Sequence, residues 1–197
     1  MKERVRALDS YIGLRHAMAG GPADVSVTGL HGGARSLIIA CLAEDIESPI
    51  LVIASDPVSA RDAVEDLSIF GAAGIVSYPE DEMLPYDYHD PDRNLTGMQM
   101  LALEKLAAAK ERILVCTARS SLKKVFHPDE FGRLLQDVEV GDERDPLDLI
   151  ERFMQLGYER HETVEAKGQF ALRGGILDLF EVSASDPVRL EFDGDEI

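Results

Sequence analysis

The sequence predicts an α/β protein with a doubly wound, mostly parallel sheet and a degenerate phosphate-binding loop, followed by a smaller α+β domain. Three observations lead to this prediction. Short apolar runs alternate with helical patterns early in the chain, residues 25–40 are laid out as a strand, a loop and a helix, and the pattern changes after His127-Pro128. We therefore divide the 197 residues into a first domain, 1–127, and a second domain, 128–197.

The first domain opens with an amphipathic helix and then a strand. Apolar residues recur at helical spacing over 3–18, and Gly20-Gly21-Pro22 ends that pattern. Residues 25–28 are the first expected strand, and 36–43 are apolar on nearly every side, as in a helix that packs on a sheet. Three more strands are expected at 50–54, 75–78 and 113–116, where continuous apolar runs are typical of a sheet covered on both faces.

Two helices separate these strands. Asp56 is a good N-cap, Pro57 fits the first helical position, and Gly71 ends the apolar periodicity, so a helix is expected between them. A second helical pattern covers 95–112 and leads directly into the last strand of the domain. Strands and helices thus alternate along the chain, as in doubly wound folds.

The loop between 29 and 36 has the layout of a phosphate-binding loop without its key residues. An intact loop reads G-x-x-x-x-G-K-[ST], with backbone N–H groups and the lysine around the phosphates and the hydroxyl on Mg²⁺. Here Gly29 opens the loop and Ser36 closes it, but Ala34 replaces the second glycine and Arg35 replaces the lysine. Neither replacement is conservative. We expect a structural strand-turn-helix corner that binds no nucleotide and needs no cofactor.

The polar link over 78–94 is long enough to be functional on general grounds. Its possible metal ligands are Asp87, His89, Asp90 and Asp92. No helical or turn spacing makes them converge, so a solvated loop is favoured over a metal site. No nucleophile elbow, metalloprotease helix or zinc ribbon occurs in the sequence, and no catalytic residue is predicted.

The second domain is predicted from one helix and three strands. Asp145-Pro146 starts a helix that Gly157 ends. Strand patterns follow at 169–172, 176–182 and 188–192, the first two joined by Gly174-Gly175. The chain stops directly after the last of these strands, so we expect further residues beyond it.

Charge and composition exclude several classes of protein. The net charge is −17, and residues 128–197 hold 7 basic and 19 acidic side chains, so no clustered positive face for nucleic acid is apparent. No apolar run approaches the roughly 18 residues of a membrane span, and no signal peptide is apparent, which favours a cytoplasmic protein. Cys41 and Cys116 lie singly in apolar segments and are expected to be buried thiols.

Three tracts of the sequence resemble a known family. They are EDEMLPYDYHDP at 80–91, ILVCTARSSL at 113–122 and LGYERHETVEAKGQFALRGGILDLFEV at 156–182. The resemblance is to the N-terminal, UvrB-like region of bacterial transcription-repair coupling factors (Mfd), and it spans 25–197. UvrB carries an intact phosphate loop whereas Mfd proteins carry a decayed one, so Ala34 and Arg35 fit Mfd better than UvrB.

The resemblance implies a function in DNA repair. The whole protein would be an ATP-dependent DNA translocase that displaces stalled RNA polymerase and recruits nucleotide excision repair, while this part would be a non-catalytic module that binds UvrA and that a C-terminal domain masks. The family's UvrA-binding arginines fall on Arg160 and Arg173, and one basic residue of the UvrB set falls on Ala171. Phe170 lies between the two arginines and is either an anchor or part of the core. The alternatives are an active nucleotide hydrolase and a UvrB-like module that binds damaged DNA.

Overall fold

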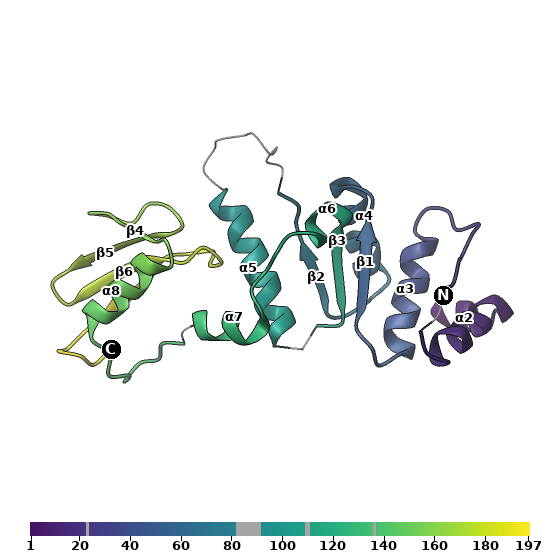
Figure 1. Cartoon of the computed structure of the whole chain (residues 1–197), viewed down its shortest axis with the longest axis horizontal. Coiled ribbons are helices and arrows are strands. Elements are labelled where there is room, and N and C mark those ends of the chain that lie inside the picture. The colour runs from purple at the N-terminus through teal and green to yellow at the C-terminus, as the bar shows by residue number, and fades with distance from the viewer. Residues whose placement is uncertain (23, 82–91, 109–110, 136) are drawn as a thin grey trace. The chain divides into compact units, whose positions relative to one another are not determined.

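The computed structural model describes residues 1–22, 24–81, 92–108, 111–135 and 137–197 (Figure 1). These residues form two compact units, Met1–Glu80 with Lys105–Lys124 and Asp81–Glu104 with Val125–Ile197. Most of helix α5 (Arg93–Ala107) belongs to the second unit. The division predicted from the sequence, between residues 127 and 128, places the same helix in the first domain. That division stays a prediction.

The first unit is built on a three-stranded parallel sheet. The strands are β1 (Ile50–Ala54), β2 (Ile75–Tyr78) and β3 (Ile113–Thr117), in the order β1-β3-β2. Ile50 of β1 and Ile75 of β2 both pair with Ile113 of β3. The first residues of the three apolar runs are therefore aligned across the sheet. Strands at 50–54, 75–78 and 113–116 are therefore confirmed, and with them the α/β class of the chain.

Helices α3 (Ala34–Asp45) and α4 (Pro57–Ile69) supply the core of this unit. Ala40 of α3 and Leu67 of α4 are fully buried against Ile113 and Val115. The carboxylate of Asp56 accepts a hydrogen bond from the Ser59 N–H at 2.9 Å, which caps α4 as predicted. Cys41 and Cys116 are buried free thiols, and burial raises the pKa of both.

The N-terminal segment differs from the prediction of one helix over 3–18. It forms α1 (Lys2–Arg6) and α2 (Asp9–Ala19), with extended backbone at Leu8. The break directs two side chains to one carboxylate of α3, because Arg6 Nε and the Tyr11 hydroxyl both donate to Asp45 at 2.9 Å. Tertiary hydrogen bonds therefore overrule the local helical pattern.

The predicted strand at 25–28 is wrong for this structure. The segment is irregular, and Val25 and Val27 are 44% and 48% exposed. A strand needs a neighbour for its N–H and C=O groups, and these residues pair with none of the three described strands of the first sheet. The α/β class holds without this strand.

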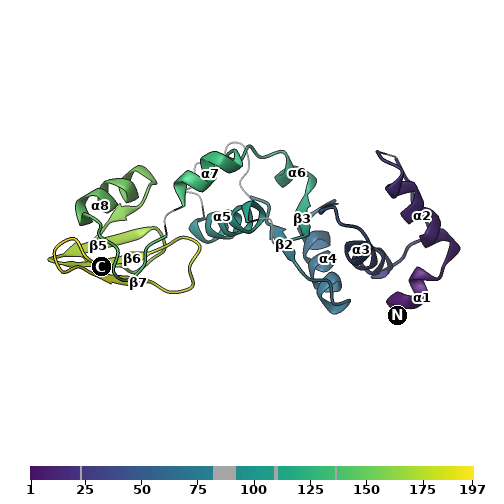
Figure 2. The same ribbon diagram turned by 90° about the horizontal axis from the view of Figure 1, so that it is seen from below.

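The second unit contains a four-stranded sheet with one helix on a face. Its strands are β4 (Glu159–Arg160), β5 (Gln169–Arg173), β6 (Ile176–Phe180) and β7 (Val188–Glu191), in that order. β4 runs parallel to β5, and the other neighbours are antiparallel. Figure 2 shows α8 (Pro146–Gln155) on one side of this sheet. The predicted helix and three strands are confirmed, while β4 was not predicted.

Two short helices complete the described elements. They are α6 (Ala118–Ser121), directly after β3, and α7 (Pro128–Leu134), which Pro128 opens in the second unit. Within the described ranges, no helix combines the length and apolar character needed to cross a bilayer.

Gly97 marks a close approach between α5 and another part of the second unit. A Cβ atom at this position would overlap the carbonyl oxygen of Val182, which is a backbone atom and cannot move without shifting the chain. We expect Gly97→Ala to lower the free energy of unfolding by about 1–3 kcal/mol, the usual cost of overpacking. Urea denaturation followed by circular dichroism measures this change.

Gly13 offers a matched control because it also lies inside a helix. Nothing lies within 4 Å of its ideal Cβ position. Gly13→Ala is expected to raise the free energy of unfolding by up to about 1 kcal/mol, since alanine favours the helix more than glycine does. Stabilisation by both substitutions would contradict the close packing of Gly97.

Candidate partner-binding site

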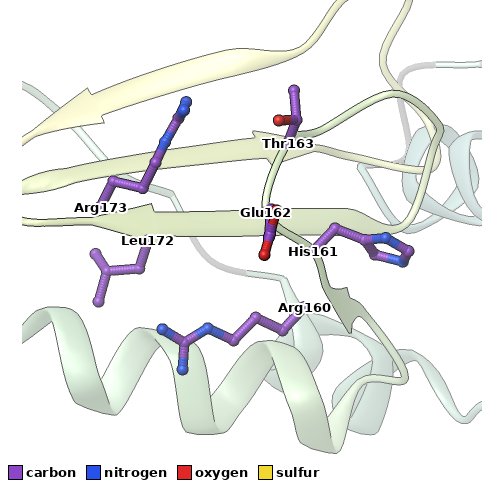
Figure 3. Close-up of a pocket in the computed structure, with 6 residues that line it drawn as sticks. All are labelled: Arg160, His161, Glu162, Thr163, Leu172 and Arg173. Atoms are coloured by element: carbon purple, nitrogen blue, oxygen red, sulfur yellow. The ribbon is translucent and has the colours of Figure 1, made fainter.

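The second sheet brings Arg160 and Arg173 to one hollow of ≈ 510 Å³. Arg160 ends β4, level with Phe170 of the neighbouring strand, and Arg173 ends β5. The lining residues are Arg160, His161, Glu162, Thr163, Leu172 and Arg173. Figure 3 shows the Arg160 and Leu172 side chains on the side of α8 and the Arg173 side chain on the opposite side of β5. The two guanidinium groups thus border the hollow from different sides of the sheet.

Arg173 is held by a carboxylate from the next strand. Asp178 lies opposite Ala171 on β6 and accepts a hydrogen bond from Arg173 Nη2 at 3.0 Å. Arg189 of β7 binds the same carboxylate through two nitrogens, at 2.6 and 2.9 Å. The hydrogen bonds from Arg189 and Arg173 hold the pKa of Asp178 below its ordinary value. Arg173 therefore has a fixed direction although its side chain is 58% exposed.

Arg160 has a different environment. It is exposed, and within the described part of the chain its side chain makes no hydrogen bond or ion pair. Its strand is fixed by a neighbour, because Arg93 of α5 forms an ion pair with Glu159 and donates to the Lys167 carbonyl at 3.0 Å. A hydrogen bond from His161 and the charge of Arg93 hold the pKa of Glu159 below its ordinary value.

These contacts suit the recognition of carboxylates. A guanidinium group presents a rigid fork of donors that matches a carboxylate and sheds water at low cost. Arg160 has no ion pair among the described residues that a partner would have to displace. Arg173 shares the carboxylate of Asp178 with Arg189. Residues 128–197 contain few basic side chains, and two of them line this hollow. The hollow is therefore a positively charged place on a mostly acidic domain.

Phe170 belongs to the core. Its side chain is 0% exposed and packs with Leu149, Ile150 and Leu177, and its ring centroid lies 5.9 Å from that of Phe153. Of the two roles left open by the sequence, an exposed anchor is therefore excluded in this structure. The reason is the pleat, which directs Phe170 toward α8 while Ala171 faces the other way.

Sequence reasoning missed the groups that hold the two arginines in place. Asp178 gave a signal, since it is a charged residue inside the apolar run 176–180 and lies two strand positions from Arg173 in the hairpin. Arg93 gave none. It lies 66 residues from Glu159, and no local pattern connects them.

In the segment predicted to be a degenerate phosphate loop, an internal carboxylate lies close to the start of α3. Gly33 is the N-cap of α3, and a Cβ there would lie 3.3 Å from Asp66 Oδ2 of α4. The hydroxyl of Ser36, which would bind Mg²⁺ in an intact loop, donates to the same Asp66 oxygen at 3.2 Å. The protein thus places its own carboxylate at the start of α3, next to Ala34 and Arg35.

We expect the chain to bind no nucleotide measurably. The phosphates would meet the repulsion of the Asp66 carboxylate, without the second glycine and the lysine that Ala34 and Arg35 replace. Calorimetric titration with ATP and Mg²⁺ tests this expectation. A dissociation constant in the micromolar range would contradict it.

The structure offers no metal site within its described ranges, where no three His, Cys, Asp or Glu side chains are grouped to hold an ion. Of the candidates in the polar link, Asp87, His89 and Asp90 lie outside the described residues.

Known proteins are similar in sequence to both units of this chain. Residues 137–197 match the UvrB interaction domain family. Over 98% of its length the chain is 26% identical to the transcription-repair-coupling factor of Bacillus subtilis, and over 88% it is 34% identical to that of Myxococcus xanthus. The chain covers 16% and 15% of these two proteins. It is also 25% identical to the UvrABC system protein B of Methanobrevibacter smithii, over 90% of the chain and 29% of that protein.

The chain is therefore an α/β protein whose residues 137–197, in the second unit, match the UvrB interaction domain family. The resemblance to the UvrB-like part of bacterial transcription-repair coupling factors, which the sequence tracts predict, is confirmed by these matches. The chain spans about a sixth of the length of the coupling factors that it matches.

Proposed function

We propose that this chain is a non-catalytic module that recruits nucleotide excision repair by binding UvrA, with 128–197 as the docking domain. The observation that carries the proposal is the pair Arg160 and Arg173, which borders one hollow in a domain similar to UvrB interaction domains. In a protein with the length of its relatives, other domains would translocate on DNA with ATP, bind RNA polymerase and mask this hollow.

The proposal assigns the two arginines to carboxylates of UvrA. An arginine at an interface commonly contributes strongly to binding, because its guanidinium group combines several hydrogen bonds with apolar contact. Both arginines line the hollow at the surface. Asp178 orients the Arg173 side chain, and Arg93 fixes the strand that carries Arg160. Phe170 has no part in the contact.

Isothermal titration of the chain with purified UvrA tests the proposal. We expect a saturable complex whose affinity falls as salt rises, because charged pairs at an interface are screened. The same titration with duplex DNA is expected to give little heat at physiological salt, since the chain carries a net charge of −17. Tight, steeply salt-dependent binding of DNA together with no binding of UvrA would favour the alternative of a damage-binding module.

A further inference from the structure

The outer edge of β5 is only partly covered. β4 pairs with Gln169 and Phe170, and the last main-chain hydrogen bond along this edge runs from the His161 N–H to the Phe170 carbonyl, at 2.9 Å. β5 itself continues to Arg173. Within 137–197, all of which is described, no backbone group of another segment is bonded to this edge beyond Phe170.

The register shows which residue the open edge presents. Alternate residues of a strand direct their N–H and C=O groups to opposite edges, so Leu172 faces the same way as Phe170. The Gly174-Gly175 turn agrees, because it joins the directly paired residues Arg173 and Ile176, whose groups face each other. Leu172 therefore presents one donor and one acceptor at the edge that β4 leaves uncovered.

This open position lies inside the hollow. Leu172 is one of its lining residues, and Arg160 and Arg173 border it on either side (Figure 3). An unpaired strand edge accepts an extended segment through main-chain hydrogen bonds, while neighbouring pockets select its side chains. Two arginines and one carboxylate, that of Glu162, line this hollow. Because the positive side chains outnumber the negative one, acidic residues on the incoming segment are favoured.

We propose that the hollow receives a short, extended, acidic segment of the partner protein, which adds to the outer edge of β5 as a further strand. Its backbone bonds the N–H and C=O of Leu172, and its carboxylates meet Arg160 and Arg173. This proposal rests on the proposed function and specifies the binding mode at the same hollow.

Hydrogen–deuterium exchange at single amides tests the proposal with the full 197-residue chain, alone and with saturating UvrA. We expect the Leu172 amide to exchange quickly in the free chain and at least about tenfold more slowly in the complex, the change that one new main-chain hydrogen bond brings. The Ala171 amide faces β6 and is expected to be protected in both states.

A matched pair of substitutions adds an affinity measurement. Leu172→Pro removes the edge N–H, whereas Leu172→Val keeps it and shortens the same side chain, which packs partly against the α8 cluster. We expect the proline variant to bind UvrA about tenfold more weakly than the valine variant. If the proline variant fails to fold, the exchange measurement decides alone.

The outcomes separate this proposal from the proposed function. A complex with UvrA in which the Leu172 amide exchanges as in the free chain, or equal affinities of two folded Leu172 variants, overturns strand addition and leaves the proposed function standing. Absence of any complex overturns both. Protection of the Leu172 amide in the absence of UvrA, at concentrations where the chain associates with itself, overturns the assignment to an acidic partner in favour of a second copy.

Discussion

Replacement of Arg160 and Arg173 together by glutamate is expected to weaken UvrA binding by more than about a hundredfold. Truncation of an interface hot-spot arginine commonly costs on the order of 2 kcal/mol, and 1.4 kcal/mol corresponds to about tenfold in affinity. Arg160→Ala and Arg173→Ala are each expected to weaken binding at least about tenfold on this basis. Reversal of both charges adds repulsion between the new glutamates and carboxylates of the partner.

Folding should survive these changes. Both side chains are exposed, and an exposed ion pair such as that of Arg173 with Asp178 contributes about 0–1 kcal/mol to stability. Asp178 also keeps its two hydrogen bonds from Arg189 when Arg173 is changed. Circular dichroism and the urea midpoint verify that the variants are folded before the titration.

Arg133 is the matched control for the double replacement. It is exposed on α7 in the same unit and does not line the hollow. Arg133→Glu changes the net charge as each single reversal does, so it separates a local contact from general electrostatic attraction. Arg189 is unsuitable as a control because it shares Asp178 with Arg173. If Arg133→Glu weakens binding as much as Arg160→Glu does, the assignment of the docking surface is wrong.

Phe170→Ala should lower the free energy of unfolding of the second unit by about 3–5 kcal/mol. Removal of a fully buried aromatic ring loses its transfer free energy and leaves a cavity among Leu149, Ile150 and Leu177. This is a large fraction of the roughly 5–15 kcal/mol that stabilises a typical domain. Urea denaturation followed by circular dichroism measures the loss.

Phe126→Ala provides the comparison, because the Phe126 side chain is 51% exposed. We expect this change to cost under about 1 kcal/mol, since little apolar surface leaves the interior. Similar costs at the two positions would show that Phe170 does not belong to the core. A loss of UvrA binding by Phe170→Ala has to be corrected for the unfolded fraction before it is compared with the arginine variants.

The elements that the sequence predicted well have local signals. The Asp56-Pro57 start of α4 and the Gly174-Gly175 turn between β5 and β6 depend on the conformations of a few neighbouring residues. The apolar runs of β1 and β3 need no partner to be identified, because their composition already indicates burial.

The features that the sequence could not predict depend on distant contacts. The break between α1 and α2 is explained by hydrogen bonds to Asp45, which lies more than 30 residues further along the chain. The short strand β4 is held by Arg93, which lies 66 residues before Glu159 in the sequence. Residues 25–28 have a composition typical of a strand. Whether they form one depends on a neighbouring strand to which they can hydrogen-bond, and four residues of sequence cannot show whether that neighbour is present. For the candidate site, the family motif predicted Arg160 and Arg173, a prediction that the structure does not test. The contact of Asp178 with Arg173 could be identified only from the register of the hairpin.

The Asp66 carboxylate at the start of α3 has a consequence for any attempt to rebuild an ATPase from this chain. Reversion of the loop by Ala34→Gly and Arg35→Lys would restore the motif and still leave the Ser36 hydroxyl engaged by an internal anion. The negative charge would also oppose the phosphates at the place where the helix dipole should attract them. A gain of nucleotide binding therefore requires a change in α4 as well. The obstacle to phosphate binding thus involves both α3 and α4, and motif repair in α3 alone would not remove it.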